Sequence, residues 1–212
     1  MITFKQYLKE AERDVDDLKT LLNDDAGEFL HMSGGHYLIR AMKVAKGQRR
    51  YVQDPYDKEN ILEYYVIRPR MNRQPTDTSQ QVHEFLDDWF NDHFGFRARS
   101  QAVFAFGQKV KQGDIDNYGK PYMIFPVGDF DYVWSPTVED LYAQTIGMKL
   151  EIDFRMTDWE SAYDEFLTNN GYQKKSLEKA VLSRNEVMVK CDFYYAFPME
   201  YKDTINKMLS SL

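Results

Sequence analysis

Charged residues interrupt apolar, strand-like segments at two distant points of the chain. Arg40 lies inside the segment 36–42, and Glu186 directly precedes the apolar run 187–189. A charge within a sheet costs free energy unless it is paired or faces a cleft. One interpretation is therefore a sheet-edge position or a buried ion pair. The other is a cleft in which the arginine holds a phosphate by bidentate hydrogen bonds and the carboxylate stabilises a developing positive charge.

Further arginines lie between these two positions. Arg97 and Arg99 lead into the apolar segment 102–106, and the loop 68–75 holds three more. The chain as a whole is nevertheless acidic, with a formal net charge of −7 and a pI of about 5.2. This balance argues against sequence-independent binding of DNA, which needs a basic surface. It still allows local recognition by a few arginines.

Other common sources of chemistry are absent from the sequence. It contains no GxxxxGK[ST], GxGxxG, GxSxG or HExxH motif. The single cysteine, Cys191, lies in an apolar run, where an inert buried thiol is favoured. One cysteine allows no internal disulfide, so we expect a reducing, cytosol-like compartment. No apolar run approaches the roughly 20 residues that span a bilayer, so we expect no contact with a membrane.

A helix is predicted from a cap at Asp77 or Thr78, along an apolar stripe, to a stop at Gly95. It carries His83 and His93, which lie ten residues apart and therefore about 80° apart around the axis. The same segment holds four acids, Glu84, Asp87, Asp88 and Asp92. We interpret these side chains as a solvated acidic face and expect no metal site.

The remaining pattern predicts an α+β fold of twisted, mostly antiparallel sheets with flanking helices. Strands are expected at 36–42, 61–67, 102–106, 121–126 and 131–134, with one or two more around 186–189 and 193–197, and helices at 136–146, 159–167 and 199–209. The polar stretch 43–60 is expected to be a loop. Residues 1–23 have a helical pattern that ends near Gly27. We therefore expect an N-terminal helical arm at 1–26 and a single domain at 27–212.

The order of these segments resembles the ADP-ribosyltransferase superfamily, in its arginine–serine–glutamate branch. Tyr-Leu-Ile-Arg-Ala-Met at 37–42 is similar to the family's first strand, which carries the arginine. Val-Phe-Ala-Phe-Gly at 103–107 is placed like its second motif, and Asn-Glu-Val-Met-Val at 185–189 is similar to the third, which carries the catalytic glutamate. The segments 117–119 and 122–126 fall where the family has a helix end and a following strand.

The resemblance implies that NAD is the substrate and that the fold is ADP-ribosyltransferase-like. It gives Glu186 the catalytic role, beside the ribose, where a carboxylate stabilises an oxocarbenium-like state and orients the 2′-hydroxyl. Arg40 is the first candidate to bind the phosphates, and Arg99 the second. Phe106 or Tyr118 would stack on the nicotinamide ring.

Two departures from the family pattern bear on its chemistry. Ala105 and Phe106 stand where a hydroxyl is expected, so Ser100 is the nearest candidate for the catalytic serine. Arg184 stands where arginine-modifying members carry a second acid. The resemblance therefore does not imply that arginine side chains are modified.

The first eleven residues resemble the capsid-targeting peptide of internal head proteins in large tailed phages. Leu8-Lys9-Glu10 matches the Leu/Ile-x-Glu site of the prohead protease, with cleavage after Glu10. This resemblance implies contact with the phage capsid or prohead protease, packaging in the virion interior and delivery to the host cytoplasm. The target there would be a host protein or RNA. A chance similarity of an amphipathic helix is the alternative.

Two other functions stay open at this point. The first is a non-catalytic head component or host-interaction protein on the same fold, which needs an exposed apolar patch. The second is an RNA- or nucleotide-binding module built on the arginines at 68, 70, 73, 97 and 99, which predicts binding that depends steeply on salt.

Overall fold

The computed structural model describes residues 18–43, 45–57, 59–76, 78–146 and 158–211, and these form a mixed α+β fold around one sheet. The strands are β1 Leu38–Met42, β2 Gln48–Gln53, β3 Ile61–Ile67, β4 Val103–Phe106, β5 Lys120–Trp134 and β6 Glu186–Pro198. They follow the order β2-β3-β6-β4-β1-β5, and every pairing among them is antiparallel. Because β5 also pairs with β6, the sheet curls back on itself.

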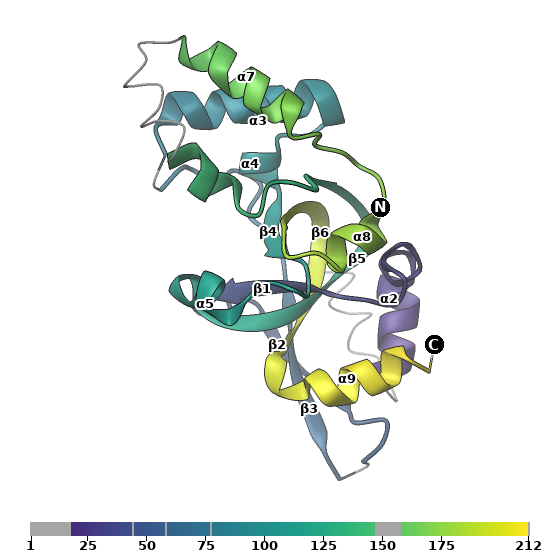
Figure 1. Cartoon of the computed structure of the whole chain (residues 1–212). Coiled ribbons are helices and arrows are strands. Elements are labelled where there is room, and N and C mark those ends of the chain that lie inside the picture. The colour runs from purple at the N-terminus through teal and green to yellow at the C-terminus, as the bar shows by residue number, and fades with distance from the viewer. Residues whose placement is uncertain (1–17, 44, 58, 77, 147–157, 212) are drawn as a thin grey trace.

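Helices cover the sheet in two groups (Figure 1). The helical elements are α2 Leu18–Ser33, α3 Gln80–Phe94, α4 Ala98–Gln101, α5 Gln112–Ile115, η1 Asp116–Tyr118, α7 Trp159–Asn169, α8 Leu177–Val181, η2 Met199–Tyr201 and α9 Lys202–Leu209, and residues 141–146 are also helical. In Figure 1, α3 and α7 lie together at the top of the molecule, away from α2 and α9.

Two hydrophobic cores correspond to these groups. The sheet core joins the strands to α2, α8 and α9, and the helical core joins them to α3, α4 and α7. Val187 and Val189 of β6 belong to the sheet core, whereas Met188 between them belongs to the helical core. This is the period-2 alternation of a strand that is buried on both faces.

Several predicted elements are confirmed. Strand 61–67 is β3, and the apolar stripe after residue 78 forms α3. Gly95 ends α3 in the left-handed conformation, with φ of 80°. The N-cap is Ser79, whose hydroxyl accepts a hydrogen bond from the Val82 N–H, and not Asp77 or Thr78. Cys191 is buried, as expected.

Other boundaries were wrong. The two strands expected at 121–126 and 131–134 are the single strand β5, which passes Gly128 through a shift in register between Val127 and Phe130. Of the one or two strands expected around 186–189 and 193–197, the structure has one, β6. The expected loop 43–60 contains β2, which pairs with β3. The helix expected from residue 136 begins at 141, and a 3-10 turn precedes the last helix.

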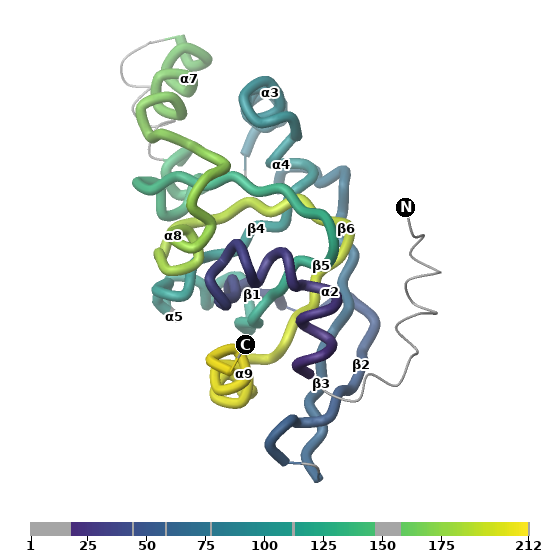
Figure 2. The backbone as a smooth tube through the Cα atoms, turned by 90° about the vertical axis from the view of Figure 1, so that its right-hand side faces the viewer, coloured from purple at the N-terminus to yellow at the C-terminus, as the bar shows by residue number. Residues whose placement is uncertain are grey.

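The N-terminal helix does not end at Asp24 to Gly27. In α2 the backbone is kinked at Ala26 and then continues to Ser33. Leu18 and Leu22 before the kink and Phe29 after it are all fully buried in the sheet core. The helix lies against β5 (Figure 2). Residues 18–26 are therefore packed into the body, while residues 1–17, with the predicted cleavage site, lie outside the described residues.

Among the helices that the structure describes, none combines the length and the apolar composition that crossing a bilayer requires.

Candidate active site

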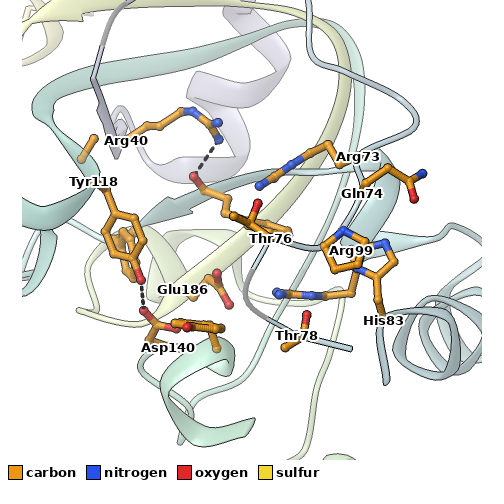
Figure 3. Close-up of a pocket in the computed structure, with 15 residues that line it drawn as sticks. Arg40, Arg73, Gln74, Thr76, Thr78, His83, Arg99, Tyr118, Asp140 and Glu186 are labelled. Carbon is orange, nitrogen blue, oxygen red and sulfur yellow. Dashed lines mark hydrogen bonds between the residues drawn. The ribbon is translucent and has the colours of Figure 1, made fainter. Parts of the chain in front are cut away.

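Five of the six predicted site residues line one cavity of about 180 Å³, here called the Glu186 cavity. They come from distant parts of the chain: Arg40, Arg99, Phe106, Tyr118 and Glu186. The close-up shows Glu186 between a group of arginines on one side and the pair Tyr118–Asp140 on the other (Figure 3). Ser100 is the predicted site residue that does not line this cavity.

Strand register explains why the arginine and the glutamate meet. Glu186 at the start of β6 pairs with Phe106 of β4, and Phe106 pairs with Ile39 of β1. Arg40 is therefore two strands from Glu186, or about 10 Å at the usual strand spacing. Phe104 and Phe106 lie two residues apart on β4 and both line the cavity, as alternation along a strand requires.

The Glu186 carboxyl is almost entirely removed from water, with 7% of the residue exposed. One oxygen accepts a hydrogen bond of 3.2 Å from the Leu141 N–H, at the start of the helix 141–146. Burial raises the pKa of this carboxyl to about 7; Arg99 opposes the rise and Asp140 adds to it. A carboxyl with a pKa near neutrality at the wall of a cavity is suited to accepting or donating a proton.

Three arginines surround the side chain and carbonyl of Phe104. Arg40 Nη1 donates a hydrogen bond of 2.9 Å to the Phe104 carbonyl oxygen. The guanidinium carbons of Arg73 and Arg99 lie 4.1 and 4.6 Å from the centroid of its ring, within the range of cation–π attraction. The carbonyl and the ring of Phe104 thus bind three positively charged side chains at one side of the cavity.

This arginine cluster (Arg40, Arg73 and Arg99) is short of hydrogen-bond partners. Within the described residues, Nε of Arg40 and both Nε and Nη1 of Arg99 are buried and have no acceptor. Burial, together with the charges of Arg40 and Arg99, lowers the pKa of Arg73 to about 10. Buried N–H groups without acceptors are costly. An anion with several oxygens, such as a phosphate, would satisfy them.

Arg99 is directed inward by a short helix that the sequence did not predict. Residues 98–101 form α4, so Arg97 is exposed and pairs with Asp88 while Arg99 is buried. One oxygen of the Asp87 carboxylate accepts hydrogen bonds from the backbone N–H groups of Arg99 and Ser100, at 2.7 and 2.9 Å. Asp87 therefore caps α4 from the neighbouring helix.

Ser100 lies behind the cavity wall and contacts residues that position the wall. Its hydroxyl donates to the second oxygen of Asp87 and lies 3.1 Å from His83 Nε2. His83 and Asp87 are 5% and 3% exposed, so the expected solvated acidic face is wrong for this pair. Their i, i+4 spacing places both on the inner side of α3. His83 lines the cavity, whereas the hydroxyl of Ser100 is engaged with Asp87.

The opposite wall is formed by Tyr118 and Asp140. The Tyr118 hydroxyl donates a hydrogen bond of 3.2 Å to Asp140 Oδ2, and burial together with this carboxylate raises the pKa of the tyrosine to about 12. Tyr118 as a whole remains 42% exposed. The next residue, Gly119, has φ of 122°, and a Cβ there would lie 2.3 Å from the carbonyl carbon of Met42. Only glycine brings Tyr118 this close to the end of β1.

Sequence reasoning missed part of the cavity wall. Arg73, Thr76, Thr78, Asp140 and Tyr142 also line it. Arg73 was expected only as one arginine of a basic loop or of a nucleotide-binding module, and nothing local marks Asp140. Phe104 could have been predicted as a further wall residue, because it lies two positions from Phe106 on the same strand and so on the same face.

Comparison with known proteins adds no relative: no protein-family model, no curated protein and no solved structure matches the chain. The geometry of the cavity is therefore the ground on which a function is assigned.

Proposed function

We propose that the protein is an ADP-ribosyltransferase-like enzyme that cleaves the nicotinamide–ribose bond of NAD. One observation carries this proposal: Arg40, Arg99 and Glu186, far apart in sequence, line a single cavity. Arg40 lies on β1, Glu186 lies on β6, and Arg99 lies on α4, the helix directly before β4. The strands β1, β4 and β6 are neighbours in the sheet. This is the convergence that the family resemblance requires.

The reacting end of NAD is assigned to the Glu186 cavity. Ligand pockets usually measure about 300–1,000 Å³, so a cavity of about 180 Å³ encloses only part of a dinucleotide. Nicotinamide riboside occupies this space, and the phosphates lie on the arginine cluster, where buried N–H groups have no partners within the described residues. Gln74, Thr76 and Thr78 offer neutral polar groups along the same wall for the adenosine.

The reaction balances without a further reagent. The bond between ribose C1′ and nicotinamide N1 breaks, and its electron pair leaves with neutral nicotinamide. An oxygen or nitrogen atom of the acceptor forms the new bond to C1′ and loses a proton, which Glu186 accepts and passes to solvent. In its ionised form the same carboxylate stabilises the positive charge that develops on the ribose.

The test is release of nicotinamide from NAD, together with transfer of adenylate label from NAD to components of a host lysate. We expect Glu186→Gln to slow both by about 10²–10³-fold, the usual effect of removing one transition-state stabiliser. Equal rates in the two proteins would overturn the role of Glu186. No turnover by either protein would overturn the enzyme assignment and favour a non-catalytic binding protein.

A further inference from the structure

A second cavity adjoins the first and has a different character. Its volume is about 520 Å³, and it shares Arg40, Ala41, Arg73 and Tyr118 with the Glu186 cavity. We call it the basic groove because six cations line it, Arg40, Lys43, Lys46, Arg68, Arg70 and Arg73. No aspartate or glutamate of the described chain is among its lining residues.

This local charge is opposite to that of the whole chain. The formal net charge is −7, which argued against sequence-independent binding of DNA, yet the cations of two separate segments, 40–46 and 68–73, gather in one groove. Lys43, Lys46, Arg68 and Arg70 are exposed at the groove while Arg40 and Arg73 form the wall toward Glu186. A groove of this kind follows a chain of phosphates, since each counterion released adds to affinity.

We infer that the basic groove binds the phosphate backbone of a single-stranded nucleic acid and that this strand is the acceptor of ADP-ribose. The acceptor role of the strand rests on the proposed function, whereas binding of the strand does not. The shared wall is where a nucleotide can pass from the groove to the reaction centre, and the exposed ring of Tyr118 stands there as a surface on which a base stacks. A single strand is specified because the target atoms of a duplex are enclosed in the base stack.

The chemistry is the same balanced transfer as above. A nucleophilic oxygen or nitrogen of the bound nucleotide attacks ribose C1′ as nicotinamide leaves with the bonding electrons. The proton of that nucleophile passes to Glu186, which lines the Glu186 cavity where the ribose is bound. Position 184, where arginine-modifying members of the family carry a second acid, is an arginine, so it supplies no carboxylate to deprotonate an arginine acceptor.

The experiment compares two full-length quadruple variants that each remove four positive charges. The groove variant replaces Lys43, Lys46, Arg68 and Arg70 by Gln. The control variant replaces Lys109, Lys111, Lys175 and Lys179 by Gln; these lysines are exposed and line neither cavity. Fluorescence anisotropy with labelled oligonucleotides of about 12 uridylates or thymidylates measures binding between about 50 and about 300 mM salt.

We expect wild type and control to bind both oligonucleotides and the groove variant to bind at least about tenfold more weakly. The slope of log affinity against log salt should fall by about 0.7 for each phosphate that the groove variant no longer neutralises. Transfer of ADP-ribose label to the oligonucleotide should disappear together with binding. Comparison of the two oligonucleotides shows whether the 2′-hydroxyl contributes.

The outcomes separate this inference from the proposed function. Equal oligonucleotide binding by the two variants overturns the inference. A raised KM for NAD in nicotinamide release, specific to the groove variant, assigns the groove to the dinucleotide itself and also overturns it. Label that passes to a lysate protein and not to nucleic acid does the same. Absence of nicotinamide release by the wild type overturns the proposed function, while the binding measurement still decides whether the groove holds a strand.

Discussion

Replacing Glu186 by Gln should make the protein more stable at alkaline pH. The pKa of this carboxyl rises from 4.5 to about 7 in the folded state because the group is buried. Each unit corresponds to about 1.4 kcal/mol, so the ionised form destabilises the fold by about 3 kcal/mol. The raised pKa means that this destabilisation is absent below pH 4.5, grows as pH rises and is complete above about pH 7. An amide carries no such charge and can still accept the hydrogen bond from Leu141.

Urea unfolding of both proteins at about pH 4.5 and about pH 8 measures this difference. We expect similar free energies of unfolding at the lower pH and a variant about 3 kcal/mol more stable than wild type at the higher pH. Glu165→Gln on α7 is the matched control, since this side chain is exposed and its replacement should have the same small effect at both pH values. A Glu186→Gln difference that does not change with pH would refute the buried, ionisable carboxyl.

Three further substitutions test the support of the site. Asp87→Ala should lower the free energy of unfolding by about 2 kcal/mol because two backbone N–H groups of α4 would be left without their acceptor; an unchanged urea midpoint would contradict the capping role. Arg99→Met should leave stability within about 1 kcal/mol and raise the KM for NAD at least about tenfold, whereas the exposed Arg97→Met should not change KM. Equal KM values would remove Arg99 from the phosphate site. Gly119→Ala should cost about 1–3 kcal/mol, and Gly113→Ala, whose Cβ meets nothing within 4 Å, less than about 1 kcal/mol; equal costs would argue against the close approach to β1.

The fold was predictable where the pattern was local and strong. The apolar stripe and the stop at Gly95 predicted α3, although its N-cap is Ser79, and an apolar run of seven residues predicted β3. The long strand β5 was divided because Gly128, with φ of 65°, is a turn signal that pairing with β6 absorbs as a bulge. The edge strand β2 was missed because it buries only Val52, so its hydropathy resembles that of a loop.

The site was predictable where a charge interrupts an apolar segment and where the family resemblance supplied further residues, Arg99, Phe106 and Tyr118. Arg40 and Glu186 were found because each interrupts or begins an apolar strand. His83 and Asp87 were assigned to a solvated face but are buried. In a helix with many polar residues, the sequence does not show which of them points inward. Contacts between residues far apart in the chain bring Asp140 beside Glu186, such as the hydrogen bond from the Leu141 N–H to the Glu186 carboxylate. No local pattern could therefore have placed Asp140 in the site.

The alternation along β6 has a consequence for how the molecule comes apart. Val187 and Met188 are neighbours in the chain, yet each is a member of a different core. Because β6 contributes side chains to both cores, loss of packing in one core displaces the strand and disrupts the other core as well. The two cores therefore should not unfold independently. We expect it to melt in one cooperative step. Glu186, the residue just before Val187, pairs with Phe106 of the sheet core and accepts a hydrogen bond from Leu141 of the helical core.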